Sequence, residues 1–64
     1  MKIYIEKDDK QLELNKSLTG LELLKELNIN PNTVIIVKNN EVVLSEEELS
    51  ETDDVKILSV VSGG

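Results

Sequence analysis

The sequence predicts an α+β fold in which one short helix packs across one face of a mixed sheet of four to five strands. Three observations predict it. Two pairs of short apolar segments, each joined by a polar turn, are typical of two hairpins. A single helix start lies between them, and the last segment, residues 55–61, is apolar on both faces, as in a central strand.

The first hairpin is expected in residues 1–15. Apolar and polar residues alternate in residues 1–6 and again in residues 11–15, which is the period of a half-buried strand. The short polar run 7–10 between them contains turn-forming residues. We therefore expect two antiparallel strands.

The helix is expected to begin after Thr19. Thr19 and Glu22 have the spacing of a capping box, and Leu18 and Leu23 occupy the two positions of a hydrophobic staple. Leu24 and Leu27, with Leu21 or Leu23, form an apolar stripe that one face of a short helix could bury. Asn28 is expected to cap the end of this helix, and Pro31 prevents its straight continuation.

A second hairpin is expected after the loop 28–32. The β-branched run 34–37 and the segment 42–44 are its strands, and Asn39 and Asn40 tolerate the positive φ of a tight primed turn. The acidic stretch 45–54 follows, and we expect a brief helical turn around Leu49. The apolar last strand is expected to lie between the hairpins, beside the first strand and parallel to it, which is the β-grasp arrangement.

These elements define one domain, residues 1–61, followed by a flexible tail, residues 62–64. Strand alternation and the helical stripe predict the side chains of the core. The predicted core consists of Ile3, Ile5, Leu14, Leu24, Leu27, Val43, Val55 and Ile57.

Composition excludes several classes of function. The 64 residues leave room for one small core, and the chain contains no cysteine or histidine, the usual zinc ligands and the usual neutral-pH base. We therefore expect neither an enzyme nor a bound cofactor or metal. The net charge of -6 disfavours nucleic acid and anionic membranes as partners. No targeting segment or membrane span is evident, so we expect a cytoplasmic protein that is a monomer when free.

The C-terminal pair Gly63-Gly64 is the strongest functional signal. Two of the three glycines of the chain are its last two residues, an arrangement with chance odds of roughly one in 200. Without Cβ atoms they form a thin arm that leaves the Gly64 carboxylate open to a partner enzyme. This suits acyl activation, in which ATP converts the carboxylate to an acyl-adenylate. The alternative is a frayed or artificial chain end.

At this point the chain resembles the ubiquitin-like sulfur carriers of the ThiS and MoaD type, and most closely the ThiS family of thiamin biosynthesis. The likeness includes the turn sequence of residues 39–43, the acidic pair Asp53-Asp54 before the last strand, and the ending Val60-Val-Ser-Gly-Gly64. Asn40 stands where the family often has glycine. The terminal Gly-Gly is the specific element, whereas many β-grasp domains share the rest.

The resemblance implies that an E1-like adenylating enzyme activates Gly64, with Gly63 and Ser62 as its tail. A sulfur donor enzyme then supplies the sulfur of a terminal thiocarboxylate, and a sulfur-accepting synthase receives this sulfur. The resemblance to the ThiS family implies that the synthase builds the sulfur into the thiazole of thiamin. The molybdopterin-synthase small subunit uses the same tail but is usually longer. Two alternatives stay open: a ubiquitin-like modifier joined through Gly64 to target lysines, and a non-reactive β-grasp interaction domain.

Leu58 and Val60 are the candidate partner-binding residues. If Val55 and Ile57 face the helix, alternation turns Leu58 and Val60 to the opposite, open face. An apolar patch leading into the tail would suit docking of the activating enzyme. Alternatively, neighbouring side chains or self-association cover this patch.

The acidic residues in the range 46–54 are a candidate site for a divalent cation, since such ions take carboxylate ligands. These residues lack the spacing of a calcium loop, so we expect a solvated acidic edge.

Overall fold

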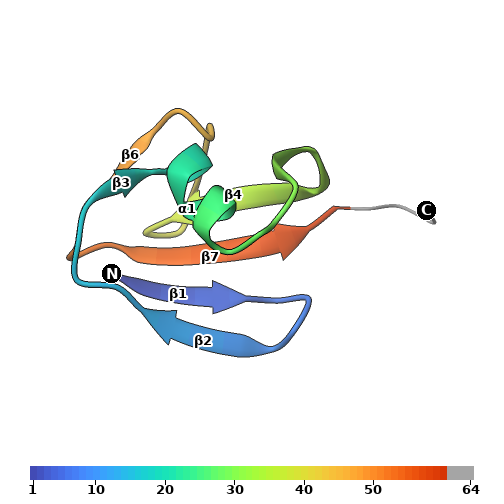
Figure 1. Cartoon of the computed structure of the whole chain (residues 1–64), viewed down its shortest axis with the longest axis horizontal. Coiled ribbons are helices and arrows are strands. Elements are labelled where there is room, and N and C mark those ends of the chain that lie inside the picture. Colours follow the sequence, from blue (N-terminus) through green and yellow to red (C-terminus); the bar gives the residue numbers. More distant parts are fainter. Residues whose placement is uncertain (61–64) are drawn as a thin grey trace.

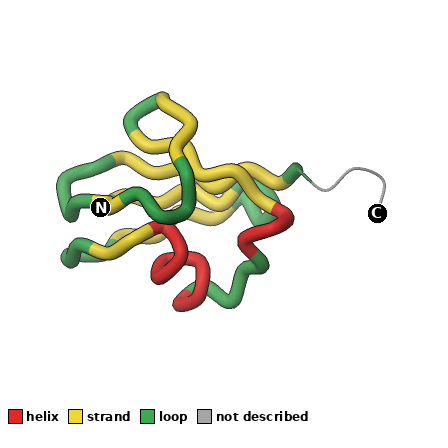
Figure 2. Tube along the Cα trace, turned by 90° about the horizontal axis from the view of Figure 1, so that it is seen from above, coloured by secondary structure: helices red, strands yellow, loops and turns green. Residues whose placement is uncertain are grey.

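A five-stranded mixed sheet, crossed on one face by a single α-helix, forms the body of the computed structural model, which describes residues 1–60 (Figure 1). The strand order is β2-β1-β7-β4-β5. These strands are β1 (Lys2–Ile5), β2 (Lys10–Glu13), β4 (Val34–Lys38), β5 (Glu41–Val43) and β7 (Asp54–Ser59). The helix α1 (Gly20–Glu26) covers one side of the sheet (Figure 2).

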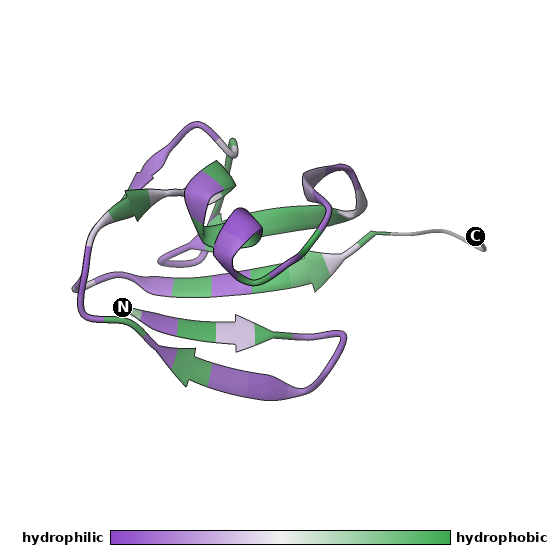
Figure 3. Cartoon of the chain, viewed as in Figure 1, coloured by the Kyte–Doolittle hydropathy of each residue, from purple (hydrophilic) through white to green (hydrophobic). Residues whose placement is uncertain are grey.

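The central strand is β7, as the sequence predicts. It pairs in parallel with β1, where Ile5 is opposite Ile57, and antiparallel with β4, where Ile36 is opposite the same residue. Both outer pairs, β1 with β2 and β4 with β5, are antiparallel hairpins. The predicted β-grasp topology is therefore confirmed. Figure 3 shows how hydropathy follows this order: the inner strand β4 is apolar except at its last residue, Lys38, whereas the outer strand β2 is mostly polar.

Local signals fix both ends of α1. The Thr19 side chain accepts a hydrogen bond from the Glu22 amide at 3.2 Å, and the Glu22 carboxylate accepts one from the Thr19 amide at 2.9 Å, so the predicted capping box is present. At the other end Asn28 has a φ of 62°, and the Ile29 amide donates to the Leu24 carbonyl at 2.8 Å. This is a Schellman ending, which asparagine tolerates. A short 3₁₀-helix, η1 (Pro31–Thr33), follows within the predicted loop.

The second hairpin closes through a primed turn. Asn39 and Asn40 have φ values of 50° and 71°, and the register places Lys38 opposite Glu41. Two consecutive residues with positive φ match the right-handed twist of the flanking strands, which explains why a pair of asparagines is compatible with this position.

The core lies between the sheet and α1. Five of the predicted core residues are buried: Ile3, Ile5, Leu24, Val55 and Ile57. The other three, Leu14, Leu27 and Val43, are partly buried against them. Five residues outside the predicted core are buried too: Met1, Leu18, Leu23, Ile36 and Leu49.

The predicted helical turn near Leu49 is wrong. Glu48–Leu49 is instead a short strand, β6, which pairs antiparallel with β3 (Leu18–Thr19) in a separate two-stranded sheet. Leu49 is fully buried opposite Leu18, and the Gly20 amide donates to the Glu47 carbonyl at 3.0 Å. Burial of Leu49 beside the start of α1 therefore outweighs the helical preference of the glutamates before it.

Candidate functional site: the open sheet face and the base of the tail

The chain leaves the sheet from its central strand. The last described backbone hydrogen bond of this strand joins the Val60 amide to the Thr33 carbonyl at 2.9 Å. β4 pairs with β7 as far as Ser59, whereas the pairing with β1 ends at Ile57, whose carbonyl accepts a hydrogen bond from the Glu6 amide (Figure 1). Ser62, Gly63 and Gly64 lie outside the described residues. The predicted tail thus begins just beyond the point at which the backbone pairing of β7 on the β4 side ends.

Alternation along β7 divides its side chains between two faces. Val55 and Ile57 are buried beneath the helix, whereas Leu58 is half-buried and Val60 is 44% exposed. Leu58 and Val60 therefore lie on the open side of the sheet, as expected from the period of two. This confirms the face assignment on which their predicted role in partner binding depends, but does not test that role.

Neighbouring strands enlarge this apolar surface. Directly paired residues share a face, and the register pairs Leu58 with Ile35 and Val37 with Val42. Val42 is 72% exposed, and Ile35 is also exposed. We call this surface the open-face patch; its members are Ile35, Val37, Val42, Leu58 and Val60.

Three members of the open-face patch were not predicted from the sequence: Ile35, Val37 and Val42. The run Val34–Val37 is continuously apolar and contains no alternation that would show which side chains point outward. One signal was available in the two-residue turn at Asn39 and Asn40. It fixes Val37 opposite Val42, so these two residues must share a face.

Polar groups border the open-face patch on the β1 side. Lys56 lies opposite Val37 on one neighbouring strand and opposite Tyr4 on the other. A shallow hollow of about 220 Å³ lies among these residues and Gln11. The Tyr4 hydroxyl donates to the Asp9 carboxylate at 2.7 Å, and this hydrogen bond raises the pKa of Tyr4. A tyrosine is protonated at neutral pH even at its ordinary pKa of about 10, and the raised pKa makes this phenol a still poorer nucleophile, so it suits recognition.

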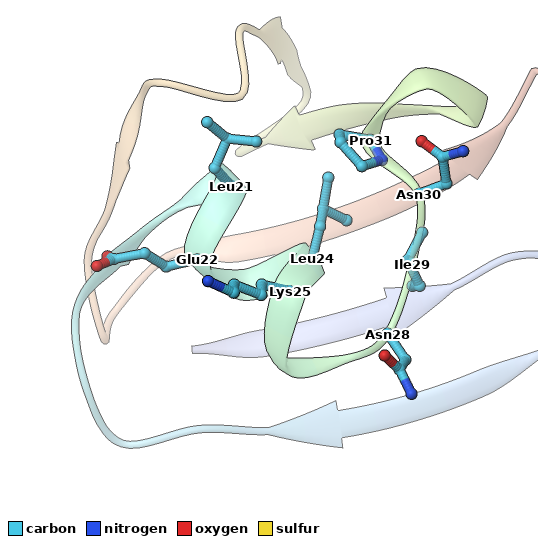
Figure 4. A pocket seen from close by; sticks show the side chains of 8 residues that line it. All are labelled: Leu21, Glu22, Leu24, Lys25, Asn28, Ile29, Asn30 and Pro31. Carbon is cyan, nitrogen blue, oxygen red and sulfur yellow. The ribbon is translucent and has the colours of Figure 1, made fainter.

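A groove of about 660 Å³ lies on the helix side, between α1 and the segment that follows it (Figure 4). Leu24 and Pro31 point toward one another across it, and Ile29 lies nearby (Figure 4). Its two charged residues are Glu22 and Lys25, and the Glu22 carboxylate is engaged in the helix cap. The groove offers apolar contact and no pair of groups for acid–base catalysis.

A second cleft, of about 430 Å³, lies beside the end of β7. Ile57 and Ile5 lie in its buried part, and Thr33, Ser59 and Asn30 add polar groups. This cleft and the open-face patch lie on opposite sides of the same strand end. Both surfaces therefore flank the point at which residues 61–64 begin.

The acidic stretch is organised at the other end of the sheet. The Ser50 amide donates to the Asp53 carboxylate at 2.7 Å, the Asn39 side-chain amide donates at 3.0 Å, and Lys38 lies 3.8 Å away. These contacts, the Ser50 hydrogen bond first, lower the pKa of Asp53. Lys38 also pairs with Glu47 at 3.3 Å. Among residues 1–60 no group of three acidic side chains is arranged to hold a metal ion.

None of the helices in the described part of the chain is long and apolar enough to cross a bilayer.

Comparison with known proteins identifies the family. The model of the ThiS family matches residues 2–64. The chain is 38% identical over 55 residues to the sulfur carrier protein TtuB of Thermus thermophilus, covering 86% of this chain and 85% of the relative. It is also 42% identical over 43 residues to an uncharacterized protein of Archaeoglobus fulgidus, covering 67% of this chain and 63% of that relative.

A solved structure shares the fold. The solution structure of a thiamine biosynthesis protein from Geobacter metallireducens superposes with a TM-score of 0.61, covering 100% of this chain and 88% of its own, at 23% identity. The likeness of fold agrees with the family match over nearly the whole sequence. The chain belongs to the ThiS family of ubiquitin-like sulfur carriers, which are small protein carriers and not enzymes.

Proposed function

We propose that this protein carries sulfur on the carboxylate of Gly64. An E1-like enzyme adenylates the carboxylate, and a sulfur donor enzyme supplies the nucleophile that converts it to a thiocarboxylate. The observation that carries the proposal is the family match, which runs through Ser62 and Gly63 to Gly64. The similarity to a sulfur carrier from Thermus thermophilus supports the same chemistry.

The proposed reaction needs nothing from this chain except an accessible carboxylate. A carboxylate oxygen of Gly64 attacks the α-phosphorus of ATP, and pyrophosphate leaves. Hydrosulfide delivered by the donor enzyme then attacks the acyl carbon, and AMP leaves with the carboxyl oxygen that it had received. The absence of cysteine and histidine from the sequence is consistent with this division of labour, because the partner enzymes supply every reactive group.

The open-face patch is the proposed docking surface for the adenylating enzyme. An extended chain of four residues spans at most about 14 Å, so a partner that receives Gly64 must approach the end of β7 closely. Leu58 and Val60 lie at that end, and Ile35 adjoins Leu58. The net charge of -6 favours a partner with basic groups around its apolar contact.

We assign the thiazole of thiamin as the final destination of the sulfur. Support comes from the ThiS family match and from the likeness of residues 39–43 to the turn sequence of that family. The relative from Thermus thermophilus is described only as a sulfur carrier and leaves the acceptor open. The competing acceptor is molybdopterin. The two acceptors can be distinguished by adding the thiazole-forming synthase or the molybdopterin synthase, one at a time, to the sulfur-loaded carrier.

Intact mass spectrometry tests the proposal. The protein is incubated with ATP, the adenylating enzyme and the sulfur donor enzyme of its own cells, and the expected product has one oxygen replaced by sulfur. Addition of the thiazole-forming synthase and its substrates should return the mass to its starting value. Conjugates of higher mass, joined to lysines and formed in place of the thiocarboxylate, would establish the modifier alternative and reject the carrier proposal.

A further inference from the structure

The two edges of the sheet differ in a way that the proposed docking face does not explain. Three of the four residues of the outer strand β2 are Lys10, Gln11 and Glu13, and such polar edges discourage pairing with other chains. The other outer strand, β5, presents Val42 at 72% exposure and is followed by Leu44 at 75% exposure. It contains no lysine, proline or bulge that would protect it.

The backbone of β5 is also open. In a hairpin closed by two residues, Lys38 and Glu41 form the first hydrogen-bonded pair, and hydrogen-bonded and non-bonded pairs then alternate. Val42 is opposite Val37 at a non-bonded position, so its N–H and C=O groups point away from β4. In the described part of the chain neither group has a hydrogen-bond partner.

Charge indicates what could occupy this edge. The exposed carboxylates of Glu41 and Glu46 lie within β5 and just beyond Leu44. A second copy of the chain would bring two such edges together, and each copy carries a net charge of -6, which opposes self-pairing. A segment that alternates apolar residues with lysine or arginine would instead satisfy the free backbone, cover Val42 and neutralise the carboxylates.

We propose that β5 binds an extended basic segment of a partner protein, which adds a strand to the open edge of the sheet. The Val42 side chain belongs to the open-face patch, so the added strand would extend that face beyond β4 and β5. The proposal is independent of Gly64 chemistry, because it rests on β5 and its carboxylates alone.

A short blocked peptide that alternates valine with lysine tests the proposal. The isotope-labelled protein is titrated with this peptide, and hydrogen exchange is followed at each backbone amide. Binding should slow exchange of the Val42 amide, and a matched peptide that alternates valine with glutamate should not bind. Val42→Pro removes the outward N–H, and Val42→Lys repels the basic peptide while keeping the backbone. Each should weaken binding at least about tenfold, since each removes at least one edge interaction.

Gln11 provides matched controls on the other edge. The Leu14 amide donates to the Met1 carbonyl, so alternation along β2 turns the Gln11 amide outward, as it does for Val42. Gln11→Pro and Gln11→Lys should leave the affinity for the peptide within about twofold of the wild type. The proposal is overturned if the wild type does not bind the peptide or if the Gln11 edge becomes protected instead. Equal binding of the glutamate peptide, or self-association that protects Val42 without peptide, would also overturn it.

Discussion

Gly20, the first residue of α1, lies close to the segment after β5. A Cβ atom at this position would lie 2.5 Å from the Ile36 side chain and 2.9 Å from the Ser45 carbonyl oxygen. Because the Ser45 carbonyl oxygen is a backbone atom, a change of side-chain rotamer cannot relieve this contact. Glycine is needed here for close approach of two chain segments and not for a special φ.

Gly20→Ala should therefore destabilise the protein, although alanine is the better helix former. We expect a loss of about 1–3 kcal/mol in the free energy of unfolding, the usual cost of overpacking a well-packed site. Urea unfolding followed by circular dichroism measures it. Leu21→Ala, at the neighbouring exposed position, is the control and should change stability much less. Equal or greater stability of the Gly20 variant would show that the Ser45 carbonyl can move.

Asp53 predicts a pH dependence of stability. Its pKa is lowered in the folded protein, chiefly by the Ser50 amide and then by the Asn39 side chain. The folded protein therefore takes up this proton less readily than the unfolded chain. The stability that Asp53 contributes is present above the ordinary aspartate pKa of about 4 and is lost as pH falls through and below that value.

The test compares the wild type with Asp53→Asn in thermal unfolding between about pH 7 and pH 3, the range that spans the ordinary pKa of aspartate. Other carboxylates titrate in both proteins, so the difference between the two curves is the informative quantity. The variant should be less stable at neutral pH, and the difference should shrink at acidic pH. A difference that stays constant over the whole range would assign the role of Asp53 to hydrogen-bond geometry and not to its charge.

At the scale of elements, the signals that the sequence carries are local. The capping box at Thr19, the turn at Asn39 and Asn40, and the alternation in β1 each involve residues within a few positions, and the structure confirms all three. The strand β6 was not predicted from the sequence because Leu49 pairs with Leu18, which lies 31 positions earlier in the chain. Only tertiary packing makes Leu49 a strand residue, since its own neighbours are helix-favouring glutamates.

The same reasoning applies to the candidate site. Alternation in β7 is visible in the sequence and correctly turned Leu58 away from the core, whereas Ile35 and Val37 lie in a uniformly apolar run. Their exposure follows from the pairing register, which depends on the whole sheet. The local sequence pattern therefore predicted the members of the open-face patch on the central strand β7, but not those on the neighbouring strands β4 and β5.

The division of β7 into two faces gives a sharp prediction for this strand. Leu58→Asp places a charge on the open-face patch and should raise the KM of the adenylating enzyme for the carrier at least about tenfold, because the charge must be desolvated on docking. It should cost only about 1 kcal/mol of stability, since Leu58 is half-buried. Enzyme kinetics and thermal unfolding of the same preparation measure both quantities.

Ile57→Asp is the matched contrast at the adjacent position. Ile57 is 1% exposed, so an unpaired carboxylate there should unfold the domain. Leu21→Asp, the same exchange at an exposed position of α1 on the opposite side of the sheet, should alter neither the fold nor the KM. If Leu58→Asp behaves like the Leu21 variant in the kinetic assay, the open-face patch is not the docking surface.

At the scale of the whole molecule, the fold separates stability from function. The helix and the buried face of the sheet enclose the core, while the opposite face of β7 and its neighbours remains open beside the base of the tail (Figures 1 and 2). A carrier must fit more than one partner, and we propose that a tail of residues 62–64 after the strand β7 permits this without change in the domain. Changes at residues 62–64 should accordingly leave the unfolding transition of the domain where it is in the wild type.

The most direct test of the central proposal adds one alanine after Gly64. The reacting carboxylate then belongs to a different residue and is displaced by about 3.5 Å along an extended chain. Wild-type and extended proteins are incubated with ATP and the cognate adenylating enzyme, and pyrophosphate release is measured. The wild type should release pyrophosphate and the extended protein should not, although both should unfold at the same temperature. Adenylation of the extended protein at the wild-type rate would contradict the proposal that the Gly64 carboxylate is the reacting group.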